Sequence, residues 1–448
     1  MLISCLPQDG RAALLVDDRI EAFEMIREPE AMAPGAIHIG RVERVSRHPA
    51  AAWLRLDGGG VAFLRLGKSP PRALAEGSLL PVQIESAAWA DKEARVSQTL
   101  TVTSRALSLC RGRPGQNHQV RLSSDVGHGQ ERDRLLSLLR AAVSDGRALL
   151  VRAPGSGLPA DRLLADLTRL DHALTEIERL CGEATAPTLI RPAPEPLHLF
   201  LRDMTPSPVT DIVVDSAAQL AAARRFTEAE APEIGQQLRL HDGAGPLFET
   251  EGVSEQLAEL VGNHVALPGG GSLIIESGAA MTTIDVNSGA GDPMAANRAA
   301  AAEIARQLQL RSLAGAIIID FIAPPRSARH DLLEMLRART KADPAGVHVL
   351  GWTPLGHVEL TRRRIGPGLA ERLLSPDSVR TMRPGIVAGD ILRALLAIRR
   401  RRPADSLVVT TSALVAECLK DRLGLVQPVE VRVETLSDAR SGGGFDVR

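Results

Sequence analysis

The chain has 448 residues, of which 44% are hydrophobic and 24% are charged. This balance excludes an intrinsically disordered chain, because enough apolar surface is present to form buried cores, and the length predicts about three structural units. The formal net charge of −1 excludes attraction to nucleic acid by the field of the whole molecule, so such attraction must come from local basic surfaces.

The N-terminus MLISCLPQDG lacks the basic start and long apolar run of a targeting segment, and no other stretch reaches the length of a membrane span, which predicts a cytoplasmic protein without membrane contact. Of the 53 basic residues, 49 are arginine. The planar fork of arginine suits phosphate recognition. A biased genome composition produces the same excess, so the arginine content alone does not indicate a function.

Residues 36–103 form short segments in which apolar and polar residues alternate, separated by Gly, Pro and charged residues. The segments are IHIGRVERV, AAWLRLD, VAFLRL, LLPVQIES and ARVSQTL. Alternation with a period of two is typical of strands that are buried on one face. The pattern predicts a small β-barrel, and barrels of the OB type bind single strands through aromatic and basic side chains.

Two helical segments follow the expected barrel. RDRLLSLLRAAVSDG and ADRLLADLTRLDHALTEIERL carry apolar residues at helical spacing, and the predicted strand ALLVRA lies between them, which indicates an α/β unit. Four prolines between Pro187 and Pro196 predict a boundary. Short strands and helices are expected from there to about Gly262, beginning with the strand LHLFLRD.

The clearest pattern is a strand, helix, strand arrangement around one sheet. GGSLIIESG and MTTIDVNSG predict a pair of strands, a helix is expected from about Ala295 to Leu313, and GAIIIDFI predicts a buried strand. A last unit begins at about Pro384. It is expected to contain a helix that ends in RRRRP, the strand SLVVTT, a second helix and the strand VEVRVETL.

Polar side chains interrupt two strands of this sheet. Because alternate residues of a strand share a face, Thr283, Asp285 and Asn287 are expected to point the same way. Asp320 stands among apolar neighbours in AIIIDFI, where an uncompensated carboxylate is costly. Two strands of one sheet can bring Asp285 and Asp320 together, and a divalent cation would then neutralise the two negative charges.

A magnesium site fits this set of residues. Mg²⁺ prefers one or two carboxylates and several waters, which leaves positions for a phosphate oxygen and an attacking water and therefore suits phosphodiester hydrolysis. Asn287 is expected to orient the phosphate. From spacing alone, the alternative is that Asp285 and Asp320 cap turns or pair with arginine at strand ends.

Three stretches resemble the catalytic-domain signature of the ribonuclease E/G family in order and in spacing: MTTIDVNSG, AAAAEIARQLQLRSLAGAIIIDFI and LGHVELTRRR. The resemblance implies that Asp285 and Asp320 bind one Mg²⁺, for which Mn²⁺ can substitute, and that Asn287 positions the scissile phosphate. It implies cleavage of single-stranded RNA to 5′-phosphate and 3′-hydroxyl ends, in the maturation of ribosomal or transfer RNA or in the decay of messenger RNA.

The chain departs from the family pattern at two places near these motifs. The segment SGAGDPM between the DVN motif and the helix is shorter and less polar than is usual in the family, which puts substrate contacts from that loop in doubt. Ala323 replaces the last acid of the family's IDFID motif, and this acid is not one of the two implied metal ligands.

The barrel segment resembles the S1 RNA-binding domain of this family, which implies that Trp53, Phe63 and Lys92 face RNA. The alternative is that both aromatic residues belong to the barrel core. ALLVRAPG is similar to the part of the family's 5′-sensor domain where an arginine and a threonine grip a 5′ monophosphate. Arg152 matches the arginine, whereas Ala153 lacks the hydroxyl donor, so a weakened preference for 5′-monophosphorylated ends is predicted. Arg152 is alternatively a solvated strand-end arginine.

Other sequence features bear on phosphate, zinc and assembly. The runs Arg362–Arg364 and Arg399–Arg402 are candidates for phosphate contacts, although such runs are usually solvated surface. The family's CPxC zinc motif is absent from RRRIGPGLAERLLSPDS, and no other cysteine pair has zinc-site spacing. No structural zinc is therefore expected, and a homodimer would not be linked by zinc.

The resemblance implies an α/β multidomain fold. An RNase H-like domain with an inserted S1 (OB) β-barrel and 5′-sensor domain would be followed by a DNase I-like catalytic domain and a small α/β C-terminal domain. The expected bounds are 1–35 and 197–262 for the two RNase H-like parts, 36–103 for the barrel, 104–196 for the sensor, 263–383 for the catalytic domain and 384–448 for the last domain.

The predicted function is a magnesium-dependent endoribonuclease, closer to the shorter ribonuclease G type because no long scaffold tail follows. Two other hypotheses stay open. The first is an RNA-binding protein of the same family that has lost turnover, suggested by the short loop, the altered sensor and the missing zinc motif. The second is a maturation factor for ribosomal RNA whose cleavage is incidental to binding.

Overall fold

A computed structural model describes residues 1–6, 9–26, 32–48, 50–66, 74–88, 93–111, 119–123, 125–126, 129–206, 208–341, 343, 345–364, 367–375, 381–401, 406–420, 422–426, 431–435 and 446–447. The chain divides into two compact units, and the sequence of unit 2 interrupts that of unit 1. Unit 1 contains Met1–Met25, Val213–Ser216 and Leu240–Arg448, and unit 2 contains Ile26–Ile212 and Ala217–Arg239. None of the helices formed by these described residues has the length and apolar character needed to cross a bilayer.

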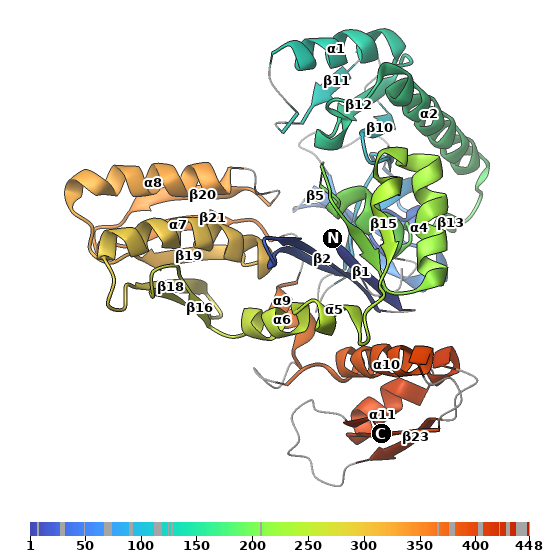
Figure 1. The fold of residues 1–448 in the computed structure, drawn as a ribbon. Helices are drawn as coiled ribbons and strands as arrows, with labels where there is room; N and C mark the ends of the chain where they lie inside the picture. Colours follow the sequence, from blue (N-terminus) through green and yellow to red (C-terminus); the bar gives the residue numbers. More distant parts are fainter. Residues whose placement is uncertain are drawn as a thin grey trace. The chain divides into compact units, whose positions relative to one another are not determined.

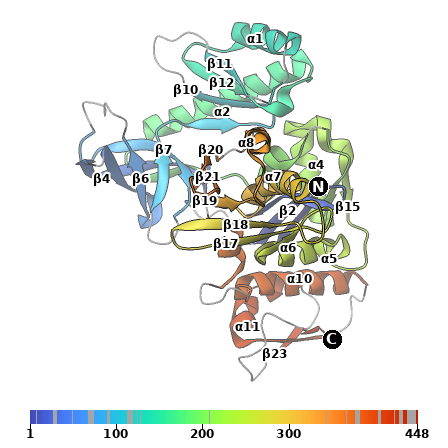
Figure 2. The same ribbon diagram turned by 90° about the vertical axis from the view of Figure 1, so that its left-hand side faces the viewer.

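A closed β-barrel forms one part of unit 2 (Figure 2). Its strands are β4 (Ile37–Arg47), β5 (Ala50–Arg55), β6 (Val61–Arg65), β7 (Leu79–Ser86) and β8 (Ala94–Ser97). They pair in the order β4-β5-β6-β8-β7, and pairing of β7 with β4 closes the barrel. Residues that alternate along each strand, among them Leu54, Leu64 and Val82, fill the interior. The predicted barrel is therefore confirmed.

An additional strand joins the barrel sheet where the sequence predicted only a boundary. Residues Thr188–Arg191 form β13, which pairs antiparallel with β4. Pro187 precedes β13, and the other three prolines follow it. The sequence analysis did not predict this strand.

A second sheet of unit 2 has the order β11-β12-β10-β9. Its strands are β9 (Thr101–Thr103), β10 (Leu107–Arg111), β11 (Gln119–Leu122) and β12 (Arg147–Val151). Helices α1 (Gln130–Ala142) and α2 (Ala160–Glu183) share one core with this sheet through leucines at helical spacing, such as Leu135, Leu139, Leu163 and Leu167. The predicted helix, strand, helix order of this α/β section is confirmed.

The segment LHLFLRD is helical, so the predicted strand is wrong. It forms α3 (Pro196–Leu199) and the π-helical turn η3 (Phe200–Met204). Pro196 occupies the first turn of the helix, where its fixed φ is favourable. The buried residues Leu197, Phe200 and Leu201 follow the i, i+3, i+4 spacing of a helix rather than the alternation of a strand. Helix α4 (Ala217–Glu230) and the turn η4 (Pro232–Gln237) complete unit 2.

The first sheet of unit 1 contains β1 (Leu2–Leu6), β2 (Asp9–Val16), β3 (Arg19–Ile26) and β14 (Ile212–Val214), in the order β14-β1-β2-β3. The short strand β15 (Leu238–Leu240) stands at the boundary between the two units in the sequence. β1 pairs antiparallel with β2 and parallel with β14, so residues more than 200 positions apart are neighbours. Helices α5 (Leu247–Thr250), α6 (Val253–Val261) and α9 (Leu369–Leu373) contribute to the same core.

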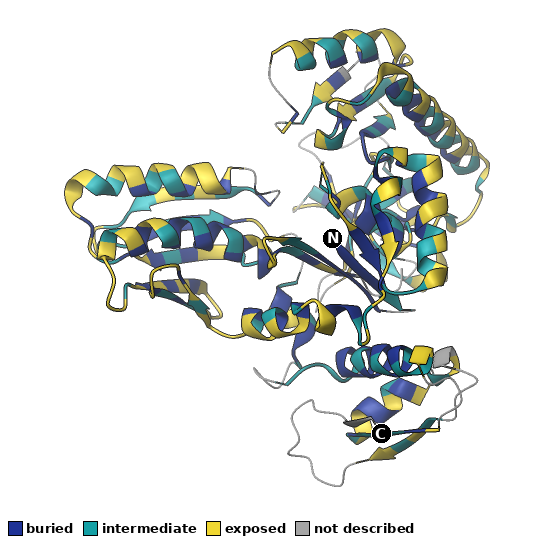
Figure 3. Cartoon of the chain, viewed as in Figure 1, coloured by how far each residue is buried: buried dark blue, intermediate teal, exposed yellow. Residues whose placement is uncertain are grey.

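The second sheet of unit 1 has the order β16-β17-β18-β19-β21-β20. Its strands are β16 (His264–Ala266), β17 (Ser272–Ser277), β18 (Met281–Asn287), β19 (Gly315–Asp320), β20 (Val347–Trp352) and β21 (Val358–Arg362). Helices α7 (Pro293–Leu310) and α8 (Arg326–Thr340) contribute to the core on one face (Figure 1). Alternate residues of β18 and the last residue of β19 are exposed, in the burial colours of Figure 3.

The last part of unit 1 is a small α/β section. Helices α10 (Pro384–Arg401) and α11 (Ala413–Lys420) pack with a sheet of order β23-β22-β24, whose strands are β22 (Leu407–Thr411), β23 (Val431–Thr435) and β24 (Asp446–Val447). The 3₁₀ turn η5 (Leu423–Val426) follows α11. The predicted order of helix, strand, helix and strand after Pro384 is confirmed.

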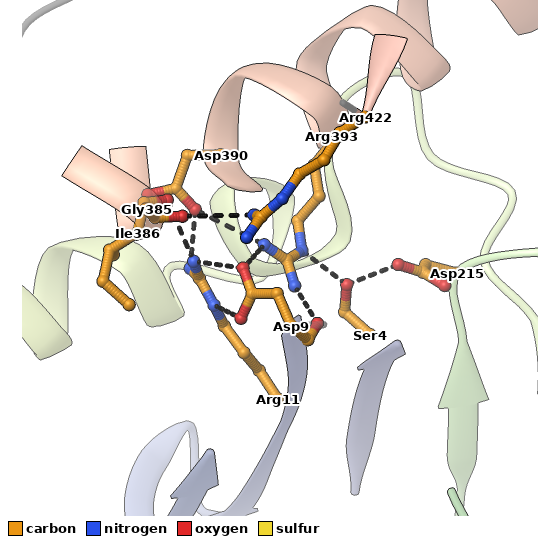
Figure 4. A network of polar contacts seen from close by, with 9 residues as sticks. All are labelled: Ser4, Asp9, Arg11, Asp215, Gly385, Ile386, Asp390, Arg393 and Arg422. Atoms are coloured by element: carbon orange, nitrogen blue, oxygen red, sulfur yellow. Dashed lines mark hydrogen bonds and ion pairs between the residues drawn. The ribbon is translucent and has the colours of Figure 1, made fainter. Parts of the chain in front are cut away.

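A buried ionic network connects α10 to the first sheet of unit 1 (Figure 4). Asp9 on β2 accepts hydrogen bonds from Arg11 Nε at 2.9 Å and Nη2 at 2.7 Å, and from Arg393 Nη1 at 2.8 Å. Arg393 also donates to Ser4 Oγ at 2.7 Å, and Arg11 donates to Asp390 at 2.6 Å. Burial opposes ionisation of Asp9, but the two guanidinium groups lower the pKa of its carboxyl to about 2. The network is thus ionised at neutral pH.

Candidate functional site

Asp285 and Asp320 occupy paired positions on two neighbouring strands of the second sheet of unit 1. β18 and β19 are parallel, and their register pairs Asp285 directly with Asp320. Adjacent strands are about 4.8 Å apart, and paired residues project to the same face. The structure therefore brings together the two acids that the sequence proposed as metal ligands, at the carboxyl ends of two neighbouring strands.

Both acids are exposed, which corrects one step of the sequence argument. β18 alternates between exposed and buried residues, with Asp285 and Asn287 on the exposed face. The side chain of Asp320 is 57% exposed. The expectation of a fully buried strand with a costly carboxylate was wrong, because α7 and α8 cover only one face and Asp320 is the last residue of β19. The argument for a bound cation at this site therefore does not rest on burial of the carboxylates. It rests on the repulsion between two adjacent negative charges, which a cation would relieve.

Asn287 is the next residue after Asp285 on the exposed face of β18. Its Nδ2 donates to Asp285 Oδ2 at 2.8 Å. An amide nitrogen has two N–H groups, so one of them remains for another acceptor beside the carboxylates. The amide therefore lies beside Asp285 on the exposed face of β18, as the alternation of this strand predicts.

The segments that follow both strands are held by buried or close contacts. The Asn297 side chain, 0% exposed on α7, accepts from Ile322 N at 3.1 Å and donates to Ile322 O at 2.7 Å. After β18, Gly289 adopts a φ of +57°, and a Cβ there would lie 2.5 Å from Gly270 O. Asp292 caps α7 by accepting from Ala295 N at 2.7 Å. These contacts fix the ends of β18 and β19, and hence the two acids.

His357 is a further polar residue of the site that the sequence reasoning missed. Its Nδ1 lies 3.0 Å from Asp320 Oδ1. It belongs to the motif LGHVELTRRR, but a single histidine in that stretch carried no signal without the pairing of β19 with β21. The contact between His357 and Asp320 matters because it fixes the orientation of the Asp320 carboxylate.

The donor set fits a magnesium ion and does not fit a site made entirely of protein ligands. Among the residues that the structure describes, no group of three His, Cys, Asp or Glu side chains is placed to hold a metal. Two adjacent carboxylates with an open side match the preference of Mg²⁺ for few carboxylates and several waters. The contacts of these acids are with Asn287 and His357, and no ion pair with arginine is found for either in the described part of the chain.

The barrel places Trp53 and Phe63 on its outer surface. They are paired residues of β5 and β6, with ring centroids 5.5 Å apart in an edge-to-face arrangement. Both are half-buried, whereas the residues beside them in sequence are buried, so the alternative that they belong to the core is wrong. The guanidinium of Arg44 lies 3.8 Å from the centroid of the Trp53 ring. Arg95 on β8 is the register partner of Phe63 on β6. Lys92 lies outside the described residues.

Arg152 is engaged by other groups of unit 2. Its Nη1 donates to Ser104 O and its Nη2 to Asp203 Oδ1, both at 2.8 Å. Arg202 also contacts Asp203, at 2.9 Å through Nε and 2.6 Å through Nη2. Burial opposes ionisation of Asp203, yet these two arginines lower the pKa of its carboxyl. Arg152 is therefore not a freely solvated arginine, because a carboxylate already occupies one arm of its fork.

The arginine runs have mixed surroundings. Arg362 is buried, donating to Asp343 at 2.8 Å and to Leu313 O at 2.8 Å, so it has a structural role. Arg364 pairs with Glu371 at 3.0 Å, and Arg363 is exposed. In the second run, Arg400 and Arg401 are exposed at the end of α10, and Arg402 is not among the described residues.

Comparison with known proteins gives consistent matches. The model of the ribonuclease E/G family matches residues 103–365. Ribonuclease G of Haemophilus influenzae is 27% identical over 469 residues, covering 96% of this chain and 94% of that protein. Ribonuclease G of Escherichia coli K12 is 27% identical, covering 94% and 92%. Ribonuclease E of Nostoc is 30% identical over 387 residues, covering 80% of this chain and 55% of that protein. The matched range includes Asp285, Asn287, Asp320 and His357.

Proposed function

Because the chain belongs to the ribonuclease E/G family, we propose that it is a magnesium-dependent endoribonuclease of single-stranded RNA. The observation that carries this proposal is the register of β18 and β19, which pairs Asp285 with Asp320 on an open sheet face. Asp285 and Asp320 would hold one Mg²⁺, with Mn²⁺ as a substitute. When bound, the ion would stabilise charge on the phosphate oxygens and make water a better nucleophile.

The residues of this chain have separate tasks in such a reaction. Asp285 and Asp320 supply the negative charge that binds the ion. The second N–H of Asn287 Nδ2 donates to a non-bridging oxygen of the scissile phosphate and so fixes its orientation. Water attacks phosphorus as the bond to the 3′ oxygen breaks, which leaves a 5′ phosphate on one product and, after protonation, a 3′ hydroxyl on the other. Substrates would be precursors of ribosomal or transfer RNA, or messenger RNA.

Incubation of the purified protein with a single-stranded, A/U-rich RNA tests this function. We expect cleavage with Mg²⁺ and none with EDTA, and we expect each new 5′ end to accept ligation without prior phosphorylation. Binding without cleavage in every metal condition would instead favour an RNA-binding protein that has lost turnover. The short turn between β18 and α7, residues 288–292, is the feature that favours this second candidate.

The finer domain assignment is also part of the proposal. The barrel would be an S1 domain within residues 36–103, followed by a 5′-sensor domain in 104–196. Residues 1–35 and 197–262 would be RNase H-like, 263–383 DNase I-like, and 384–448 a small α/β domain. The parallel pairing of β1 with β14 supports joining the first and the second RNase H-like parts. We further propose that the enzyme acts in the cytoplasm, without structural zinc, and that any homodimer forms without shared zinc.

Trp53→Ala is expected to raise the Kd for single-stranded RNA about 30-fold, since loss of one stacking partner costs roughly 2 kcal/mol. Trp53 is half-exposed beside Phe63 and Arg44, so truncation removes ring surface without opening the barrel core. Fluorescence anisotropy with a labelled 12-mer measures the change. Trp53→Phe keeps an aromatic ring, and its Kd for the RNA should lie within a few-fold of the wild-type value. Equal RNA affinity for Trp53→Ala and wild type would exclude a role of this barrel face in RNA binding.

The rate of cleavage should depend little on the 5′ end of the RNA. Ala153 lacks a hydroxyl, and Asp203 occupies one arm of the Arg152 fork, so a terminal phosphate gains few contacts. Two RNAs that differ only in having a 5′ monophosphate or a 5′ hydroxyl should be cleaved at rates within about threefold of each other. This ratio corresponds to a difference in activation free energy of less than ~1 kcal/mol. A preference well above tenfold for the monophosphate would contradict this prediction.

A further inference from the structure

His357 lies across from Asp320 because of the strand register at the open end of the second sheet of unit 1. β19 and β21 are antiparallel, with Ile319 opposite Val358. The next residue on β19 is Asp320, and the residue before Val358 is His357. Asp285, Asp320 and His357 therefore form one row across three chain segments, and opposed side chains of an antiparallel pair project to the same face about 5 Å apart.

The backbone of His357 is held at both of its polar groups. Thr353 N donates to His357 O at 2.8 Å, and His357 N donates to Thr353 Oγ1 at 3.2 Å. The turn between them includes Gly356 with a φ of +94°, a conformation that favours glycine. The imidazole thus projects from a fixed position, and its side chain is 33% exposed. Such anchoring is what a group must have to orient another side chain.

The direction of the hydrogen bond follows from chemistry. An ionised carboxylate only accepts, so His357 Nδ1 must carry the proton and donate to Asp320 Oδ1 across 3.0 Å. The bond engages one carboxylate oxygen and leaves Asp320 Oδ2 free to ligate an ion beside Asp285. A carboxylate that binds a metal is commonly held in this way by a neighbouring donor, and loss of the donor weakens metal binding.

We propose that His357 is the positioning residue of the magnesium site, acting on the ion through Asp320 and making no bond to the ion itself. The inference rests on the proposed function, since it requires that Asp285 and Asp320 bind the ion. It adds a residue whose contribution is to metal affinity. The donor at Nδ1 holds the Asp320 carboxylate in a single rotamer, so less conformational freedom is lost when the ion binds.

Titration of the full-length protein with Mn²⁺, followed by electron paramagnetic resonance without RNA, tests the proposal. His357→Leu keeps the volume but removes the donor, and it should weaken Mn²⁺ binding about tenfold. His357→Asn puts an amide N–H near the position of Nδ1 and should bind within about threefold of wild type. Cleavage by His357→Leu should recover when Mg²⁺ is raised about tenfold, whereas a variant with a damaged fold would not recover.

His348→Leu is the matched control. His348 is exposed on β20 and pairs with Thr361, which lies opposite Ala316 at the far end of β19. This variant should leave the Mn²⁺ affinity unchanged. Asp320→Asn, measured in the same titration, tests the proposed function. If this variant binds Mn²⁺ with the affinity of wild type, Asp320 is not a metal ligand and the proposed metal site is excluded.

Two results would overturn the role of His357 while leaving the metal site intact. One is an unchanged Mn²⁺ affinity in His357→Leu when Asp320→Asn has lost binding. The other is a hyperfine coupling between Mn²⁺ and ¹⁵N-labelled histidine of the size that a direct bond produces, which would make His357 a ligand. Absence of such coupling together with the expected tenfold loss supports positioning.

Discussion

Asp320→Asn is expected to lower the rate of RNA cleavage about a thousandfold at a magnesium concentration that saturates the wild-type enzyme. Asparagine is nearly isosteric with aspartate, so the pairing of β18 with β19 should persist. The substitution removes one of the two adjacent charges that would bind the ion under the proposed function. Electrostatic stabilisation by a catalytic metal is worth several kcal/mol, and about 4 kcal/mol corresponds to three orders of magnitude in rate.

Single-turnover cleavage of an end-labelled RNA measures this effect. Asp331→Asn, an exposed aspartate on α8, should retain the wild-type rate and controls for loss of a negative charge elsewhere in unit 1. Thermal unfolding of both variants shows whether the fold is intact. If Asp320→Asn cleaves at a rate close to wild type, the proposed metal site does not carry the reaction.

Gly389→Ala is expected to destabilise unit 1 by about 3 kcal/mol, although alanine is a better helix former than glycine by about 1 kcal/mol. Gly389 lies in the middle of α10, facing the ionic network. An added Cβ would overlap Asp9 Oδ2 and lie 3.1 Å from Arg393 Nη1 and 3.2 Å from Arg11 Nη2. Displacing a buried carboxylate from its guanidinium partners costs several kcal/mol, because the remaining charges lose compensation in a poorly solvated site.

Gly385→Ala is the matched control on the same helix. Apart from its chain neighbours and the backbone of its own helix, no described atom lies within 4 Å of the position that its Cβ would take, so this substitution should be neutral or stabilise by up to about 1 kcal/mol. Hydrogen exchange of peptides from β2 and α10, followed by mass spectrometry, measures both variants. Equal protection of these peptides in Gly389→Ala and Gly385→Ala would show that the network does not hold α10 in place.

The type and order of most elements follow from the sequence. Alternating residues predicted the barrel strands, and helical spacing predicted α1, α2, α7 and α10. Segments whose pattern fits two structures were less predictable. LHLFLRD alternates like a strand, yet its apolar residues also match a helix, and Pro196 favours the helix start. β13 was missed because a four-residue strand between prolines is defined by its pairing with β4, which local sequence does not contain.

The candidate site was predictable as residue identities, through the family resemblance, but not as geometry. That Asp285 and Asp320 share a register, and that Asp320 is exposed, depends on strand pairing and on which face α7 and α8 cover. His357 was missed for the same reason. Its partner is 37 residues away in sequence, and only the β19–β21 pairing brings the two together.

The buried network of Asp9, Arg11 and Arg393 also has a consequence for synthesis of the protein. Asp9 and Arg393 are 384 residues apart, and a ribosome that adds about 5–20 residues per second needs roughly 20–80 s to travel between them. During that interval β1 and β2 have no α10 against which to pack, while all residues of unit 2 have been translated. Until α10 is synthesised, the charged side chains of Asp9 and Arg11 therefore remain solvated.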